Sequence, residues 1–234
     1  TAGKYGSGLT FDGTDDVVRT VETPSIDLGA TTDSYTVETW FKTTTDFSGN
    51  AYLVGKIDSS ATTYPFVLYL SAFEEIQTNI LEGANNPGNF TPSGGYNDGK
   101  WHYVSFVRNV GTDTLYLYVD GVLLDSDTDT TTATTANNLD ITIGANRDDP
   151  PAFEFTGDID DVKIYRYART ASQIIEDMNA GHPAPGSPVG SPLGYWKFDE
   201  GYGDTANDSG TDATLDGTAT GTVWRLENST SGGC

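Results

Sequence analysis

The chain has 234 residues, a formal net charge of -22 at pH 7, and 36% hydrophobic and 12% aromatic residues. A chain of this length with so many aromatic side chains can bury a core, which argues against disorder despite the charge. The same charge excludes nucleic acid as the expected partner, because its phosphates would be repelled. The carboxylates comprise 25 Asp and 9 Glu, and Asp favours turns and oxygen-ligand metal sites, which points to calcium.

The single cysteine, Cys234, excludes a disulfide within the chain, and we assign it no role. No apolar run is long enough to span a membrane. Sparse cysteine together with abundant Thr and Gly suits a bacterial or archaeal surface protein. We therefore expect an extracellular or cell-surface location.

In the first part of the chain, short apolar runs between turn residues predict β-strands. The first two runs flank the turn Asp12-Gly13-Thr14-Asp15, where Asp-Gly supplies the positive φ that a tight turn needs. A loop rich in Gly, Asn and Pro follows over 81–100, and loops of that length are often functional. The strands are expected at residues 8–11, 16–21, 35–42, 51–57, 64–71 and 74–80.

Aromatic residues in this part are candidates for contacting a sugar. Val37 and Phe41 are expected to face inward, which leaves Trp40 on the outer face of its strand. A ring in that position would offer a platform for a sugar, and the alternative is that Trp40 packs under a loop. The candidate ligand-binding residues are Trp40, Tyr64, Tyr69 and Tyr96.

The second part predicts further strands and one helix. Residues 101–108 form a run that is apolar on both faces, which suits a central strand, and residues 115–124 predict a hairpin through Asp120-Gly121. A strand is expected at 139–144. Thr170 opens a capping box for a helix that ends near Gly181 and covers a sheet edge. About ten short strands at roughly 8–12-residue spacing indicate a sandwich or barrel.

Residues 155–165 form the last predicted strand. Val162 and Ile164 share one parity, and period two places Asp160 and Asp158 on the same side, toward the core. A carboxylate there must lie at the rim of the sheet, be paired, or hold a cation. We interpret the pair as part of a cation site at the rim; the alternative is that both carboxylates begin the strand in water and bind nothing.

Six motifs resemble laminin G-like modules of the concanavalin A-like lectin/glucanase superfamily, over about Lys4 to Gly181. The resemblance implies an all-β fold, a two-sheet antiparallel jelly-roll sandwich with one short helix. It also implies an extracellular module that often binds calcium at the rim and binds glycan or protein with a concave face or its loops. The motifs are GSGLTFDGTDD at 6–16, YTVETWF at 35–41, DGKWHYV at 98–104, LYVDG at 117–121, ITIG at 141–144 and FTGDIDDVKIY at 155–165.

The chain departs from the family in the position of one strand. Family members usually begin with a strand like GYWKFDEG, which here stands near the end, at 194–201. The resemblance therefore divides the chain into a jelly roll lacking its usual first strand (1–181), a Pro/Gly linker (182–193) and a displaced first-strand segment (194–234). That segment either completes its own sandwich, pairs into a neighbouring copy, or opens a second repeat that is cut off.

The resemblance also implies a set of calcium ligands. In related glucanases the ion is held by an Asp of the last strand, by oxygens of the first strand, and by the loop after the second strand. Carried over, the ligands are Asp160, Glu200 or its carbonyl, and an oxygen near Asp12 and Gly13.

We therefore expect a non-catalytic, extracellular, calcium-binding module for glycan or surface-protein binding and adhesion. One alternative is a structural subunit of a filament or surface layer, assembled by donating strand 194–200 to another copy. The other is a glycoside hydrolase, which needs two carboxylates about 5–10 Å apart across one bond. No strand offers such a pair, because Glu74 and Glu75 are adjacent and face opposite sides, so we expect no enzyme.

Overall fold

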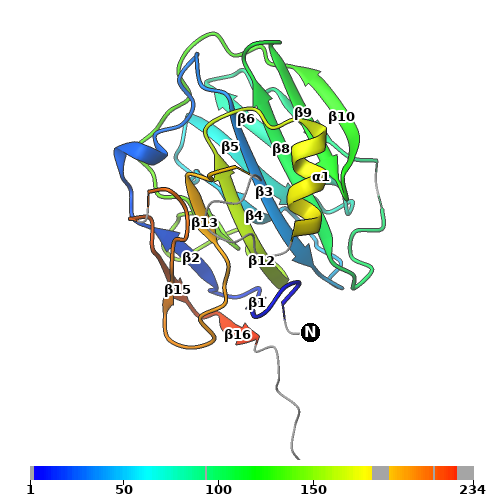
Figure 1. The fold of residues 1–234 in the computed structure, drawn as a ribbon, viewed down its shortest axis with the longest axis vertical. Coiled ribbons are helices and arrows are strands. Elements are labelled where there is room, and N and C mark those ends of the chain that lie inside the picture. The colour runs from blue at the N-terminus through cyan, green and yellow to red at the C-terminus, as the bar shows by residue number, and fades with distance from the viewer. Residues whose placement is uncertain (1–2, 93, 181–189, 213, 226–234) are drawn as a thin grey trace, which may run out of the picture.

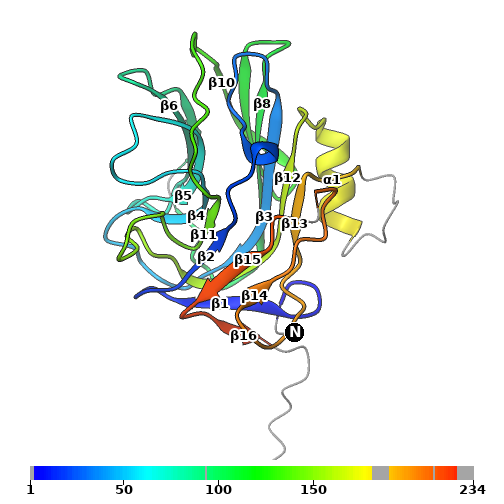
Figure 2. The same ribbon diagram turned by 90° about the vertical axis from the view of Figure 1, so that its left-hand side faces the viewer.

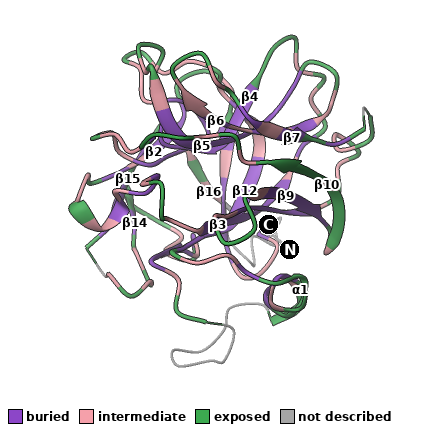
Figure 3. Ribbon diagram, turned by 90° about the horizontal axis from the view of Figure 1, so that it is seen from above, coloured by how far each residue is buried: buried purple, intermediate pink, exposed green. Residues whose placement is uncertain are grey.

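The structure is a computed structural model that describes residues 3–92, 94–180, 190–212 and 214–225. Two antiparallel sheets pack face to face, with one helix outside the first (Figure 1). The all-β sandwich expected from the sequence, consistent with a jelly roll, is confirmed. Seen from above, the second sheet, the first sheet and the helix α1 lie in three successive layers (Figure 3).

The first sheet has the order β10-β9-β8-β3-β12-β1-β16, and β13 also pairs with β12. Hairpins account for the β8-β9-β10 part, and Asp120 and Gly121 both have positive φ in the β9–β10 turn, as predicted. The strands are β1 (Gly8–Asp12), β3 (Tyr35–Lys42), β8 (His102–Asn109), β9 (Thr114–Val119), β10 (Val122–Thr128), β12 (Thr156–Tyr165), β13 (Gly194–Trp196) and β16 (Val223–Arg225).

The second sheet has the order β14-β15-β2-β11-β4-β5-β6-β7 (Figure 2). A short 3-10 helix, Pro24–Ile26, lies between β2 and β3. The strands are β2 (Val17–Thr20), β4 (Ala51–Gly55), β5 (Thr63–Leu70), β6 (Ile76–Glu82), β7 (Gly88–Phe90), β11 (Thr142–Ile143), β14 (Thr205–Ala206) and β15 (Gly217–Thr220).

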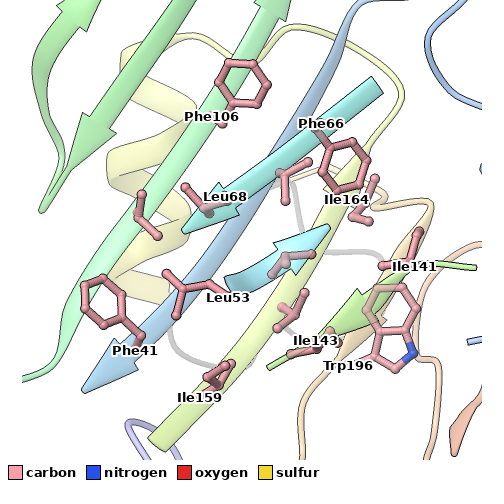
Figure 4. Packing of buried hydrophobic residues seen from close by; sticks show 14 of the residues in the cluster. Phe41, Leu53, Phe66, Leu68, Phe106, Ile141, Ile143, Ile159, Ile164 and Trp196 are labelled. Carbon is pink, nitrogen blue, oxygen red and sulfur yellow. The ribbon is translucent and has the colours of Figure 1, made fainter. Parts of the chain in front are cut away.

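The core lies between the two sheets. Phe41 and Phe106 of the first sheet face Leu53 and Phe66 of the second, and all four are fully buried (Figure 4). Alternation along the strands produces this layer: Val37 and Phe41 point inward from β3, while Trp40 points outward, as predicted.

The tail adds strands to both sheets of its own chain. Trp196 of β13 pairs with Val162 of β12, while β15 pairs with β2 and β16 pairs with β1. The Trp196 side chain is fully buried in the core, and its Nε1 donates a hydrogen bond to the Leu215 carbonyl at 2.9 Å. Most of the predicted linker, Gly181 and Cys234 lie outside the described residues.

The helix α1 (Ala171–Ala180) begins with the predicted capping box. The Thr170 N–H donates to Gln173 Oε1 at 2.9 Å, and the Gln173 N–H donates to Thr170 Oγ1 at 3.3 Å. The expectation that the helix covers a sheet edge is wrong. It lies on the outer face of the first sheet, with Ile174 packed in one cluster with Trp40 and Tyr103 (Figure 1).

Strand β12 does not keep period two. The register against β3 shifts between Asp160 and Lys163, and Asp161 has a φ of 53°. Ile159 therefore faces the core together with Val162 and Ile164. The predicted inward orientation of Asp158 and Asp160 is wrong, because this bulge reverses the parity and places both carboxylates on the outer side.

Candidate functional site

The outer face of the second sheet carries a group of rings that we call the aromatic row: Tyr52, Tyr64, Tyr69 and Phe153. Tyr52 of β4 pairs with Tyr69 of β5, and their ring centroids are 5.6 Å apart. Phe153 stacks on Tyr52 with centroids 4.8 Å apart and an interplanar angle of 12°. Tyr64 belongs to the same small apolar cluster. The row therefore runs from a loop across two neighbouring strands.

Phe153 is the exposed member of the aromatic row. It is 41% exposed, whereas the three tyrosines are 7–8% exposed. Its φ of 59° is unusual for a bulky side chain and costs about 1–3 kcal/mol. The Tyr52 N–H donates to the Phe153 carbonyl at 2.8 Å, which holds this backbone in place. A strained backbone thus presents one apolar ring to solvent.

Polar side chains brace the loop that carries Phe153. Asn146 Oδ1 accepts the N–H of Ala152 at 2.8 Å, and the Asn146 amide donates to Asp148 Oδ2 at 2.6 Å. Asp148 Oδ1 accepts the N–H of Ser59 at 3.0 Å, which joins this loop to the one after β4. The side chain of Arg147 is 39% exposed and pairs with Asp140 at 3.2 Å. Hydrogen-bonding groups therefore border the rings.

The tyrosine hydroxyls of the row stay protonated at neutral pH. Burial raises the pKa of Tyr69 to about 12, and it also raises the pKa values of Tyr52 and Tyr64. Tyr69 donates its hydroxyl proton to Gln77 Oε1 at 2.6 Å. The row is therefore an uncharged surface of rings and hydroxyl groups.

Two of the four predicted ligand-binding residues, Tyr64 and Tyr69, lie together in the row. Trp40 lies on the outer face of the other sheet, 5% exposed, with the Tyr5 ring edge-on at 6.1 Å and Lys4 Nζ 4.0 Å from its centroid. Tyr96 is half-buried and packs edge-on against His102 at 5.4 Å.

Sequence reasoning missed Tyr52 and Phe153. Tyr52 could have been found, because two predicted neighbouring strands place it opposite Tyr69 once a register is assumed. Phe153 gave no signal beyond being an apolar residue in a loop rich in Asp and Pro, and its place depends on the tertiary contact with Tyr52.

The predicted calcium ligands do not converge on one point. Asp160 Oδ2 accepts the N–H groups of Lys4 and Tyr5 at 2.7 and 3.0 Å, while its Oδ1 is buried without a hydrogen-bond partner among the described residues. Asp12 pairs with Thr156, four residues before Asp160 on the same strand, which corresponds to about 13 Å. These positions are too far apart to share one ion.

The other two predicted calcium ligands, Glu200 and Gly13, each have different neighbours. Glu200 Oε1 accepts the backbone N–H of Asn207 at 2.8 Å, and the residue lines a cavity of about 350 Å³ with Tyr202 and Asp204. Gly13 has a φ of 83°, and a Cβ there would lie 2.1 Å from Thr156 Oγ1, so it permits a close turn. Asp12 instead lies with Asp15 and Asp16, and one carboxylate oxygen from each of the three lies within 4.8 Å of the others.

A two-sheet antiparallel β-sandwich with aromatic residues on one outer face is the class of fold that this geometry defines. The family model of the concanavalin A-like lectin/glucanases superfamily matches residues 12–175, and the chain belongs to that superfamily. This confirms the resemblance seen in the sequence. No curated protein matches the chain. No helix in the described ranges is long and apolar enough to cross a membrane.

Several solved structures share the fold. A candidate carbohydrate-binding protein from Bacteroides ovatus is 16% identical with a TM-score of 0.71, and the match covers 95% of this chain and 60% of that one. A heptameric SAP-like pentraxin from Limulus polyphemus is 15% identical with a TM-score of 0.64, covering 95% of both chains. The CBM40 of a Ruminococcus gnavus IT-sialidase, solved with α2,3-sialyllactose, is 15% identical with a TM-score of 0.59, covering 73% of this chain and 95% of that one.

Proposed function

We propose that this protein is a non-catalytic glycan-binding module that works outside the cell or at its surface, and that the aromatic row is its contact surface. The observation that carries the proposal is Phe153, an exposed ring stacked on Tyr52 and held in a strained backbone. Strain of this kind persists only where the surroundings impose it, and it gathers at ligand-binding sites.

The chemistry of the row suits a sugar. A pyranose ring has apolar C–H faces that pack on aromatic rings, while its hydroxyl groups need hydrogen-bond partners. Phe153 supplies the ring, and Asp148 and Arg147 border it with polar groups. The printed descriptions of two structural neighbours, a candidate carbohydrate-binding protein and a CBM40 with sialyllactose, support the same class of ligand.

We also propose calcium as the cation of this module, as the laminin G-like resemblance implies. The three carboxylates at the β1–β2 turn support a cation, because close like charges are relieved by a bound divalent ion. A calcium-dependent module of this kind would serve adhesion to a glycan or to a glycan-bearing surface protein.

The test is affinity electrophoresis of the full chain through gels that contain neutral polysaccharides, with α2,3-sialyllactose titrated in parallel. We expect retardation by a neutral polysaccharide, because the net charge of -22 disfavours an anionic glycan. Phe153→Ala should weaken binding at least about fivefold, since stacking on an aromatic ring contributes about 1–3 kcal/mol to ligand binding elsewhere.

The matched control is Phe73→Ala, which removes another exposed ring, 72% exposed, from the β5–β6 turn. It should leave binding unchanged. Equal losses in both variants, or no binding to any glycan tested, would contradict the proposal. Release of reducing sugar from a bound polysaccharide would contradict its non-catalytic part.

A further inference from the structure

Two turns that cross between the sheets lie side by side at one rim of the sandwich. The turn at 13–16 leads from β1 in the first sheet to β2 in the second, and the turn at 221–222 leads from β15 back to β16. The strands on either side pair with each other, with Thr10 opposite Val223 and Val17 opposite Thr220. The tail turn is therefore held beside the turn near the start of the chain.

The first turn concentrates negative charge. One carboxylate oxygen from each of Asp12, Asp15 and Asp16 lies within 4.8 Å of the others. Asp12 Oδ1 accepts the N–H of Thr14 at 2.9 Å, and Asp16 Oδ2 accepts the N–H of Asp12. Among the side chains that the structure describes, no Lys or Arg forms an ion pair with these three. Their mutual repulsion is therefore not relieved by a described cation.

Asp16 gives an independent indication of a ligand. The residue is only 2% exposed, and its Oδ1 is buried without a hydrogen-bond partner in the described part of the chain. A buried carboxylate oxygen without a partner is costly unless a cation or a donor approaches it. Burial, together with the charges of Asp12 and Asp15, raises the pKa of Asp16.

The second turn approaches the same oxygens. Gly221 has a φ of 75°, and a Cβ on it would lie 2.1 Å from Asp16 Oδ1 and 3.0 Å from Asp15 Oδ1. Both oxygens thus face the backbone of the tail turn, and only glycine leaves room for them.

We propose that Asp12, Asp15 and Asp16 bind one calcium ion, which neutralises these carboxylates and so stabilises the packing of the β15–β16 turn against them. The site locates the cation that forms part of the proposed function, and it does not depend on glycan binding. Asp16 Oδ1, Asp12 Oδ2 and an Asp15 oxygen are the protein ligands, and water completes the shell at the two exposed carboxylates. Calcium takes six to eight oxygens in irregular geometry, whereas magnesium demands a near-ideal octahedron.

The test uses the full chain after chelation and dialysis, with calcium chloride as the probe. A site with two exposed carboxylates should bind with a Kd on the order of 10⁻⁴–10⁻³ M. At tenfold excess over the Kd we expect the thermal midpoint to rise by about 3–6 °C. Amide hydrogen exchange of residues 217–225 should slow at the same time, because the tail turn packs against the neutralised carboxylates through Gly221.

Asp16→Asn is the diagnostic variant. Asn keeps an oxygen that accepts the Asp12 N–H, and it removes one negative charge. The variant should therefore be at least as stable as the wild type without calcium, and it should lose the calcium-induced rise in the thermal midpoint. Asp113→Asn makes the same change at an exposed turn between β8 and β9 and should keep the full rise. Phe153→Ala should also keep it, which separates failure of this site from failure of glycan binding.

No midpoint rise in the wild-type chain would overturn the site, and so would an equal rise in Asp16→Asn and Asp113→Asn. A rise without slower exchange at 217–225 would overturn the stabilisation of the tail turn. An equal rise with magnesium chloride would overturn the assignment to calcium.

Discussion

The burial of Asp160 makes the stability of the folded protein depend on pH. It is fully buried on the outer side of β12, and burial, followed by the charge of Asp161, raises its pKa to about 9. The N–H groups of Lys4 and Tyr5 favour its ionised form but do not outweigh burial. The folded protein therefore binds a proton here that the unfolded chain releases near pH 4.

This shift makes the folded protein less stable in alkali. A group whose pKa is higher in the folded than in the unfolded state contributes its full stabilisation at low pH. That stabilisation is lost as the pH rises toward the folded-state pKa. We expect the free energy of unfolding to fall between pH 6 and pH 9, by up to about 1.4 kcal/mol per pH unit from Asp160. Buried Glu38, with a pKa raised to about 8 mainly by burial, adds to the slope.

Urea unfolding of Asp160→Asn at pH 6, 7.5 and 9 measures this effect. The Asn side chain still accepts hydrogen bonds from the two N–H groups, so the variant should fold. Its free energy of unfolding should fall less steeply with pH than that of the wild type, and the fall that remains is due to Glu38. Asp127→Asn, at an exposed position of β10, is the control and should decline as the wild type does. An unchanged slope in Asp160→Asn would show that the carboxylate is already ionised at neutral pH.

At the scale of single elements, interactions between residues close in sequence fully determine some helices and turns, whereas other features depend on distant parts of the chain. The β9–β10 hairpin and the start of α1 follow from Asp120-Gly121 and from the capping box, whose interactions are between residues close in sequence. The bulge at Asp161 could not be predicted in this way. It depends on pairing β12 with β3 and β13 on its two sides, which lie far away in the sequence.

The same dependence on long-range contacts limits how much of the candidate site could be predicted from the sequence. Tyr64 and Tyr69 stand out in the sequence as aromatics of one strand, but the contact of Phe153 with Tyr52 joins positions about a hundred residues apart. Sequence reasoning assigned Asp12 of the acidic turn to a metal but missed Asp15 and Asp16, although the three are close in sequence. The neighbour of this turn, Gly221, could not be predicted, since the tail reaches the turn only through long-range strand pairing.

The capping box yields an element-scale prediction. Thr170→Ala removes the acceptor for the Gln173 N–H, and we expect a loss of about 1 kcal/mol in the free energy of unfolding. Chemical denaturation measures the loss. Ser172→Ala, at an exposed position in the first turn of the same helix, should change stability little. If both variants lose the same amount, the cap contributes nothing specific.

At the scale of the whole molecule, the tail contributes to the core. Trp196 is fully buried in the core (Figure 4). Strand β13 pairs with the second half of β12, whose first half pairs with β1. We propose that the tail takes the position of the strand that related modules carry at their front. The six motifs were enough to predict the sandwich, whereas the partner of the tail had to come from the structure.

Trp196→Ala tests that proposal. Removing a buried tryptophan should cost about 3–5 kcal/mol, and the thermal midpoint should fall accordingly. Trp101→Ala is the control, since Trp101 is only partly buried at the start of β8, and its loss should be clearly smaller. If Trp196→Ala unfolds at the wild-type midpoint, the tail packs loosely and the sandwich is stable without it.

Strands β1 and β16 are neighbours, with Gly8 opposite Arg225, so the polypeptide enters and leaves the sandwich at one corner. Adjacent ends are the geometry that lets a domain be accommodated within a surface loop of a host protein. A module built like this one could therefore be grafted into an unrelated scaffold at a single site, without forcing the two sides of the host loop apart.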